Sequence, residues 1–104
     1  MTQCLIYMTA SNDAEARTIA RILVQERLAA CVNILAGMRS VYRWEGKIQE
    51  ESEIVLIAKT RSDRVPALTD RVTEIHSYDC PCVVAIPIDG GNSDFLDWID
   101  AETS

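Results

Sequence analysis

The sequence predicts an α+β fold in which an antiparallel sheet carries two helices on one face. Segments with strand character and segments with helical periodicity follow one another in the order β-α-β-β-α-β. A short helical segment comes last. The 104 residues are the usual size of one domain, so we expect a single domain over residues 1–104. This order is that of the ferredoxin-like, split β-α-β arrangement.

The first third of the chain predicts a strand followed by an amphipathic helix. Residues 3–9, QCLIYMT, are a short apolar run that ends in polar residues. In residues 11–29 the apolar side chains recur every three or four positions, which produces one apolar stripe. Asn12 is well placed to cap this helix, and Glu15 three residues later completes a pattern similar to a capping box.

The middle of the chain predicts a second strand and an extended hairpin. Residues 31–35, CVNIL, are β-rich, and we expect this strand to be broken near Gly37. Large residues then alternate through 39–50, RSVYRWEGKIQE, around the turn signal Glu45–Gly46. The sequence therefore predicts two extended arms joined by a tight turn.

The last part of the chain predicts a strand, a helix, a strand and a short helix. Residues 53–59, EIVLIAK, are the most strand-like run, and Asp63 is expected to open a helix that has Pro66 in its first turn. Residues 83–88, VVAIPI, form the last strand, and Ser93 is expected to cap the final helix. With both main helices on one face, the other sheet face lacks a cover, so we expect an oligomer.

Composition and charge exclude several classes of function. Hydrophobic residues make up 48% and charged residues 25%, which is ordinary for a globular protein. The net charge is −6 and there is no long run of Lys and Arg, so nucleic acid and anionic membranes are poor partners. The start of the chain does not resemble a signal peptide, and no apolar run is long enough to span a bilayer, which predicts a cytoplasmic protein.

Residues 76–88, HSYDCPCVVAIPI, contain the one histidine of the chain and two of its four cysteines. An imidazole and two thiols at His76, Cys80 and Cys82 suit copper(I) or zinc, which predicts a metal site. A second interpretation stays open, in which His76 interacts with the end of a helix and the cysteines pack. A third is a catalytic thiol, with His76 as its base and Asp79 as the orienting group.

The hairpin predicts either a ligand cleft or a subunit interface. Tyr42 and Trp44 lie two positions apart on one extended arm, so their side chains face the same side, and Tyr78 is expected to join them. One interpretation is a cleft for a small or anionic ligand, and the other is packing between subunits. The polar groups expected to converge on the cleft are Lys47, Glu53 and Lys59.

Several motifs resemble those of the CutA family of divalent-cation tolerance proteins. The signature Ser-x-Tyr-x-Trp-x-Gly-Lys, followed by acids and a strand that ends in Lys-Thr, is similar to SVYRWEGKIQEESEIVLIAKT. LVQERLAACVNIL resembles the passage from the first helix to the second strand, and H-x-Y…P and FLDWI match the C-terminal third. The resemblance implies a compact homotrimer joined by the long hairpin, and a relation in architecture to PII-type signalling proteins.

The chain departs from the family pattern after the second helix. The family has approximately His-Pro-Tyr-Glu-x-Pro-Glu, where this chain has HSYDCPC. Cys82 therefore stands where a carboxylate is expected, which replaces a hard ligand with a soft one.

Two functions follow as expectations. The first is a non-enzymatic, cytosolic homotrimer that binds copper or another divalent or soft metal ion in the response to metal ions. The second is a PII-like signalling or scaffold trimer that binds a small anionic ligand in clefts between its subunits.

Overall fold

The structure is a computed structural model that describes residues 2–104. Its elements are β1 (Gln3–Ala10), α1 (Asp13–Gln25), β2 (Cys31–Trp44), β3 (Lys47–Arg61), a 3-10 turn (Ser62–Arg64), α2 (Val65–Ile75), β4 (Val83–Pro87) and α3 (Ser93–Glu102). Within this part of the chain, no helix is long and apolar enough to cross a membrane. The predicted order of elements is confirmed.

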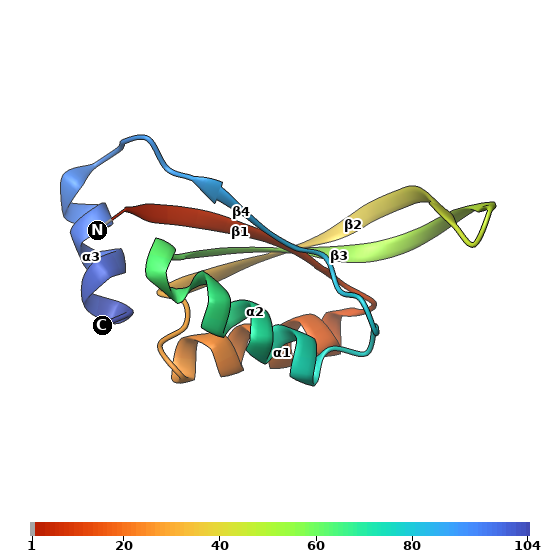
Figure 1. Ribbon diagram of the computed structural model, residues 1–104, viewed down its shortest axis with the longest axis horizontal. Helices are drawn as coiled ribbons and strands as arrows, with labels where there is room; N and C mark the ends of the chain where they lie inside the picture. The colour runs from red at the N-terminus through yellow and green to blue at the C-terminus, as the bar shows by residue number, and fades with distance from the viewer. Residues whose placement is uncertain (1) are drawn as a thin grey trace.

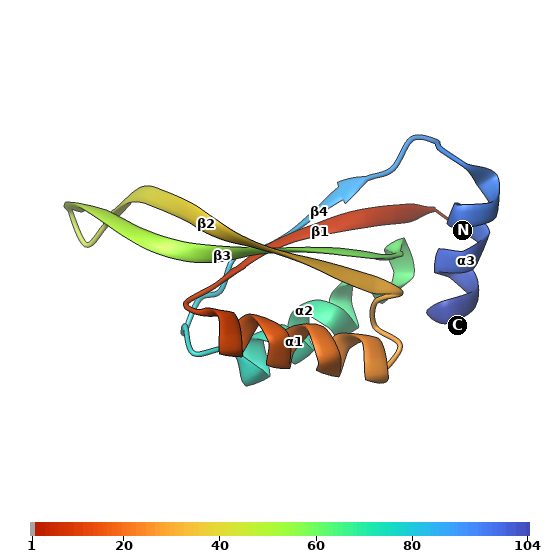
Figure 2. The same cartoon turned by 180° about the vertical axis from the view of Figure 1, so that it is seen from behind.

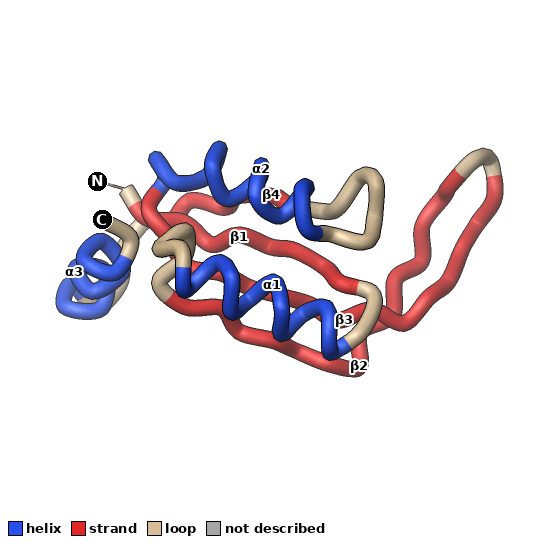
Figure 3. The backbone as a smooth tube through the Cα atoms, turned by 90° about the horizontal axis from the view of Figure 1, so that it is seen from below, coloured by secondary structure: helices blue, strands red, loops and turns tan. Residues whose placement is uncertain are grey.

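The four strands form one sheet in the order β2-β3-β1-β4, and every neighbouring pair is antiparallel. Helices α1 and α2 lie side by side on one face of this sheet (Figures 1 and 2). Seen from the helix side, the two helices cover β1 and the adjoining parts of its neighbours. The outer end of the β2–β3 hairpin, where both strands meet the turn, extends beyond them (Figure 3). The fold is the predicted ferredoxin-like arrangement.

Helix α1 begins with the predicted N-cap residue, whereas α2 and α3 do not begin at the residues that the sequence predicted. The Asn12 side chain accepts a hydrogen bond from the Glu15 N–H at 2.8 Å, as expected of an N-cap. The α3 cap is Asn92, not Ser93, because the Asn92 amide oxygen accepts from the backbone N–H two residues on. Asp63 does not cap α2, because its carboxylate instead accepts two hydrogen bonds from the Arg61 guanidinium.

The expected break near Gly37 is wrong, because β2 continues through it as a β-bulge. Leu35 pairs with Val55 and Met38 pairs with Glu53, so two residues of β2 stand opposite one residue of β3. The backbone of Gly37 has a φ of 85°, a conformation that glycine adopts without steric cost. As a result, Leu35 and Met38 face the same side of the sheet although they are three residues apart.

The apolar core lies between the sheet and the two helices. Alternate residues of β1 and β3 point into it, and α1 and α2 supply the opposing side chains. The fully buried residues include Ile6, Met8, Ile19, Leu23, Leu56 and Leu68. Met8 is therefore a core residue, with its thioether among apolar side chains.

We call the opposite side of the sheet the helix-free face. It is formed by the side chains that alternate with the core, which include Leu5, Tyr7, Thr9, Leu35, Val55, Ile57, Val84 and Ile86. Leu35, Val84 and Ile86 are exposed there. Helix α3 covers only the end where β1 begins, and Gln3 joins it by donating hydrogen bonds to the Asp100 carboxylate at 2.9 and 3.0 Å (Figure 1). The prediction that this face lacks a cover is confirmed.

Candidate functional site

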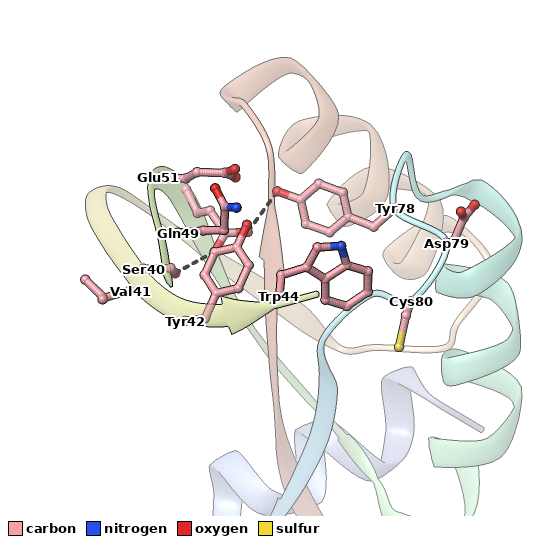
Figure 4. Close-up of a pocket in the computed structure, with 10 residues that line it drawn as sticks. Ser40, Val41, Tyr42, Trp44, Gln49, Glu51, Tyr78, Asp79 and Cys80 are labelled. Carbon is pink, nitrogen blue, oxygen red and sulfur yellow. Dashed lines mark hydrogen bonds between the residues drawn. The ribbon is translucent and has the colours of Figure 1, made fainter. Parts of the chain in front are cut away.

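A cleft of about 770 Å³ lies between the β2–β3 hairpin and the loop that follows α2. Figure 4 shows the rings of Tyr42, Trp44 and Tyr78 around this space, with Cys80 on the loop side. The charged side chains that line it are all carboxylates, from Glu51, Glu53 and Asp79. We call this space the acidic cleft.

Glu53 is the most buried charged group of the acidic cleft, with 8% of the residue exposed. One carboxylate oxygen accepts a hydrogen bond from the Ser40 hydroxyl at 2.5 Å, and the other accepts from the Tyr78 hydroxyl at 2.8 Å (Figure 4). Among the described residues no cationic side chain pairs with it. A buried negative charge that only neutral groups satisfy keeps a strong attraction for a cation.

Burial and the nearby carboxylates shift the pKa values of three neighbouring groups. Burial and the Glu53 carboxylate raise the pKa of the Tyr78 hydroxyl well above its usual value. Burial and the hydrogen bond with Glu51 raise the pKa of Tyr42, and burial followed by the Glu53 charge raises the pKa of the Cys82 thiol. In each case burial acts first, and a nearby carboxylate further disfavours a second anion.

His76 ends α2 and anchors the loop within the subunit. Its Nε2 is 2.8 Å from the carbonyl oxygen of Thr9, and its Nδ1 accepts a hydrogen bond from the Tyr78 N–H at 3.0 Å. Since a carbonyl only accepts and an N–H only donates, this pattern corresponds to a neutral ring with the proton on Nε2. The side chain is 1% exposed and packs against the Tyr78 ring.

The three predicted metal ligands do not converge inside the subunit. His76 has both ring nitrogens engaged with the backbone, so it binds a metal only if one of these bonds breaks. Cys80 is exposed in the acidic cleft, and Cys82 is half-buried before β4. Across residues 2–104 no three His, Cys, Asp or Glu side chains form a group that would hold an ion. Metal binding by the two cysteines stays a prediction.

The Cys–His pairing required for a catalytic thiol is not formed either. The hydrogen bonds of the His76 ring go to Thr9 and Tyr78, and neither involves a sulfur atom. All four cysteines are free thiols. The ring therefore positions Tyr78, whose hydroxyl then reaches Glu53.

Lys47 and Lys59 do not line the acidic cleft. Lys47 opposes Trp44 beside the hairpin turn. The Lys59 ammonium donates to the side-chain oxygen of Asn33 and to the Cys31 sulfur at 3.7 Å. Cys31 is consequently half-buried beside a cation, whereas Cys4 is buried. Within the subunit, the two lysines do not converge on one anion.

The sequence prediction missed Ser40 and Glu51 as residues of the cleft. The signal for Ser40 was present, because it lies two positions before Tyr42 and four before Trp44 on one extended arm. Side chains at that spacing share a face of the strand. Glu51 likewise lies two positions before Glu53 on the facing arm.

The fold and cleft together define a ferredoxin-like α+β protein with an acidic, aromatic site at the end of an uncovered sheet face. The model of the family described as "CutA1 divalent ion tolerance protein" matches residues 4–102. The divalent-cation tolerance protein CutA of Thermus thermophilus is 46% identical over 99 residues, which are 95% of this chain and 96% of that protein. The chain belongs to the CutA1 divalent ion tolerance family.

Solved structures agree with this assignment. The T. thermophilus divalent cation tolerance protein superposes with a TM-score of 0.96 at 44% identity, over 98% of this chain and 99% of that one. CutA1 from Oryza sativa has a TM-score of 0.97 at 43% identity, covering 100% and 95% of the two chains.

The human protein CutA is 45% identical over 93 residues, which are 89% of this chain and 52% of that protein.

Glu15 provides a test of how the loop is anchored. Burial raises the pKa of its carboxyl, but hydrogen bonds from Ser11 and Ser77 outweigh this and lower the pKa from 4.5 to about 2. A lowered pKa in the folded state stabilises that state above about pH 5, and the stabilisation is lost as the pH falls toward 2.

We therefore expect Glu15→Gln to lower the free energy of unfolding at pH 7 by about 3 kcal/mol at most. The difference from the parent should shrink steadily between about pH 5 and pH 2. Denaturant unfolding at a fixed protein concentration measures it, with Asp70→Asn on the exposed side of α2 as the control. A difference that is constant with pH would contradict the anchoring role of the Glu15 charge.

Proposed function

We propose that the protein is a non-enzymatic, cytoplasmic homotrimer that binds a divalent or soft metal ion, such as copper, at the acidic cleft. The observation that carries this proposal is the buried Glu53 carboxylate, which has hydrogen-bond donors but no cationic partner among the described residues. Glu51, Asp79 and Cys80 line the same cleft and are all groups that bind metal ions.

The uncovered apolar surface supports the oligomer. Besides the helix-free face, the hairpin exposes large apolar side chains, with Trp44 57% and Ile48 68% exposed. An apolar surface of this extent usually marks an interface between chains. Closed cyclic symmetry is the rule for assemblies of identical subunits. A neighbouring subunit against the hairpin would also enclose the acidic cleft and lower its access to water.

The relatives' names are consistent with a role in metal tolerance, since the family and its T. thermophilus member are described by divalent ion or cation tolerance. Location varies among the relatives. The Oryza sativa protein is named chloroplastic, and an Archaeoglobus fulgidus structure is named periplasmic. For this chain, a cytoplasmic location is part of the proposal.

The runner-up is a signalling trimer that binds a small anion. The sequence favoured it because Lys47 and Lys59 were expected to line one cleft together with the aromatic side chains. Within the subunit, three carboxylates line the cleft and neither lysine does, which favours a cation. An anion would then need positive charge from a neighbouring copy.

We expect the parent protein to bind copper or zinc and to bind phosphate or nucleotides weakly or not at all. Glu53→Gln removes the buried charge but keeps the shape of the side chain, so it should weaken metal binding by about tenfold or more, which is about 1.4 kcal/mol. Anaerobic titration calorimetry measures the affinities, with Asp70→Asn as the surface-charge control. A parent that binds a nucleotide or phosphate but no metal would replace this function with the anion-binding one.

The assembly is tested separately through Trp44. At micromolar concentration we expect light scattering to give about three times the chain mass of 11.6 kDa. Trp44→Ala should weaken association by about 2 kcal/mol or more, because it removes a large aromatic anchor. Arg43→Ala is the matched control, because Arg43 is the neighbouring exposed residue and points to the opposite side of the same arm. A monodisperse monomeric parent would overturn the trimer.

A further inference from the structure

Three aromatic rings line the acidic cleft, and coordination of a metal ion does not account for them. Tyr42 and Trp44 come from the hairpin and Tyr78 from the loop after α2 (Figure 4). Metal ions are coordinated by oxygen, nitrogen and sulfur atoms, not by the faces of aromatic rings. A volume of about 770 Å³ is also that of a site for a small organic molecule, and a single ion would fill only a small part of it.

The hairpin leaves the rings of Tyr42 and Trp44 exposed, with 37% and 57% of the two residues accessible. Among the described residues neither ring packs against another aromatic ring. The two residues are two positions apart on β2, so their side chains leave one face of the strand about 7 Å apart. Because a ring attracts a cation within about 6 Å of its centre, one cation between the two rings is within reach of both.

The Tyr78 ring is supported from behind and polarised by its hydrogen bond. The His76 ring packs against it with 4.6 Å between the ring centroids. The neutral imidazole adds no positive charge there that would repel a cation. The Tyr78 hydroxyl donates to the Glu53 carboxylate at 2.8 Å. A phenol that donates to an anion carries more negative charge on its ring, which strengthens the attraction for a cation.

The combination of ring faces and carboxylates favours an alkylated ammonium ion. Its charge is spread over the carbon atoms around the nitrogen, so it needs no coordinating lone pair and gives up its water easily. A magnesium ion or a lysine-like ammonium is strongly hydrated and would lose that water between the rings. All the charged side chains that line the cleft are carboxylates, and they supply the opposite charge.

We propose that the acidic cleft is an aromatic cage for a small molecule that carries a trimethylammonium group. Tyr42, Trp44 and Tyr78 provide the ring faces, and Glu53 provides the buried negative charge. This inference goes beyond the proposed function, because it assigns the cleft a second class of ligand and does not require a metal ion. The volume of the cleft accommodates a whole small molecule, so the ligand is a free molecule and not the headgroup of a membrane lipid.

The charge of the ligand is tested first, by calorimetric titration with choline and with its neutral isostere, the alcohol in which a quaternary carbon replaces the nitrogen. Choline should bind about tenfold or more tightly than the isostere. Equal affinities, or no binding of choline, would overturn the proposal. Phosphatidylcholine vesicles present the same group on a lipid and should not sediment with the protein. Binding to vesicles without binding to free choline would overturn the assignment to a small molecule.

The role of the rings is tested by fluorination of Trp44. The chain has two tryptophans, so Trp98→Phe leaves Trp44 as the one position that takes up fluorotryptophan. Fluorine withdraws negative charge from the ring face and hardly changes the size of the ring, so folding and assembly should be retained. Choline affinity should fall with each added fluorine, by about fivefold or more in the most fluorinated protein. An affinity that does not change with fluorination would show that the rings do not form a cage.

Two controls accompany this series. Unfluorinated Trp98→Phe should bind choline like the parent, because Trp98 lies on α3 and does not line the cleft. Light scattering should give the same mass for the fluorinated and unfluorinated proteins, which separates loss of the ligand from loss of assembly.

The buried charge is tested by Glu53→Gln, which should weaken choline binding by about tenfold or more. Asp70→Asn, on an exposed residue of α2, is the matched control and should bind like the parent. Unchanged choline affinity in Glu53→Gln would contradict the role of the buried charge. Copper and zinc titrations of the same proteins distinguish the two proposals. A parent that binds choline but no metal contradicts only the proposed function, and one that binds metal but no choline contradicts only the cage.

Discussion

Both oxygens of the Glu53 carboxylate accept hydrogen bonds from hydroxyl groups, and this pair of bonds holds the site together. Ser40 donates from the hairpin, and Tyr78 donates from the loop after α2. Tyr78 is held in turn by His76, whose ring bonds to the carbonyl of Thr9 on β1. A buried carboxylate without a cationic partner is costly, and a bound cation would offset that cost.

The one-sided placement of the helices explains where the site lies. With α1 and α2 on one face and α3 at one end, the other face keeps exposed apolar side chains. The site residues on β2 and β3 lie at the edge of that face, where the hairpin leaves the body of the protein (Figure 3). Assembly and ion binding would therefore involve the same part of the molecule, so that forming the oligomer would change the surroundings of the ion site.

Much of the fold follows from local patterns that are visible in the sequence. Alternation and helical periodicity predicted the order of the elements, and the turn at Glu45–Gly46 has the two positive φ angles, 51° and 78°, of a tight hairpin turn. The bulge at Gly37 was not predictable in the same way. An extra residue shifts the alternation by one position, and this shift is indistinguishable in sequence from the end of a strand.

The site was predicted less completely because its geometry depends on contacts between distant segments. A histidine beside two cysteines suits a metal ion, but the sequence does not show that Thr9, 67 residues away, takes one ring nitrogen. Tyr78 and Glu53 were predicted in the cleft, and the hydrogen bond between them was not.

The most direct test of this account is anomalous diffraction at the copper edge from crystals grown anaerobically with copper(I). The account predicts one ordered copper peak per subunit in the acidic cleft, at the Glu53 carboxylate. The hydrogen bonds of His76 to Thr9 and Tyr78 should be intact in the same crystal. A copper peak on His76, or a copper-loaded crystal with no peak in the acidic cleft, would contradict it.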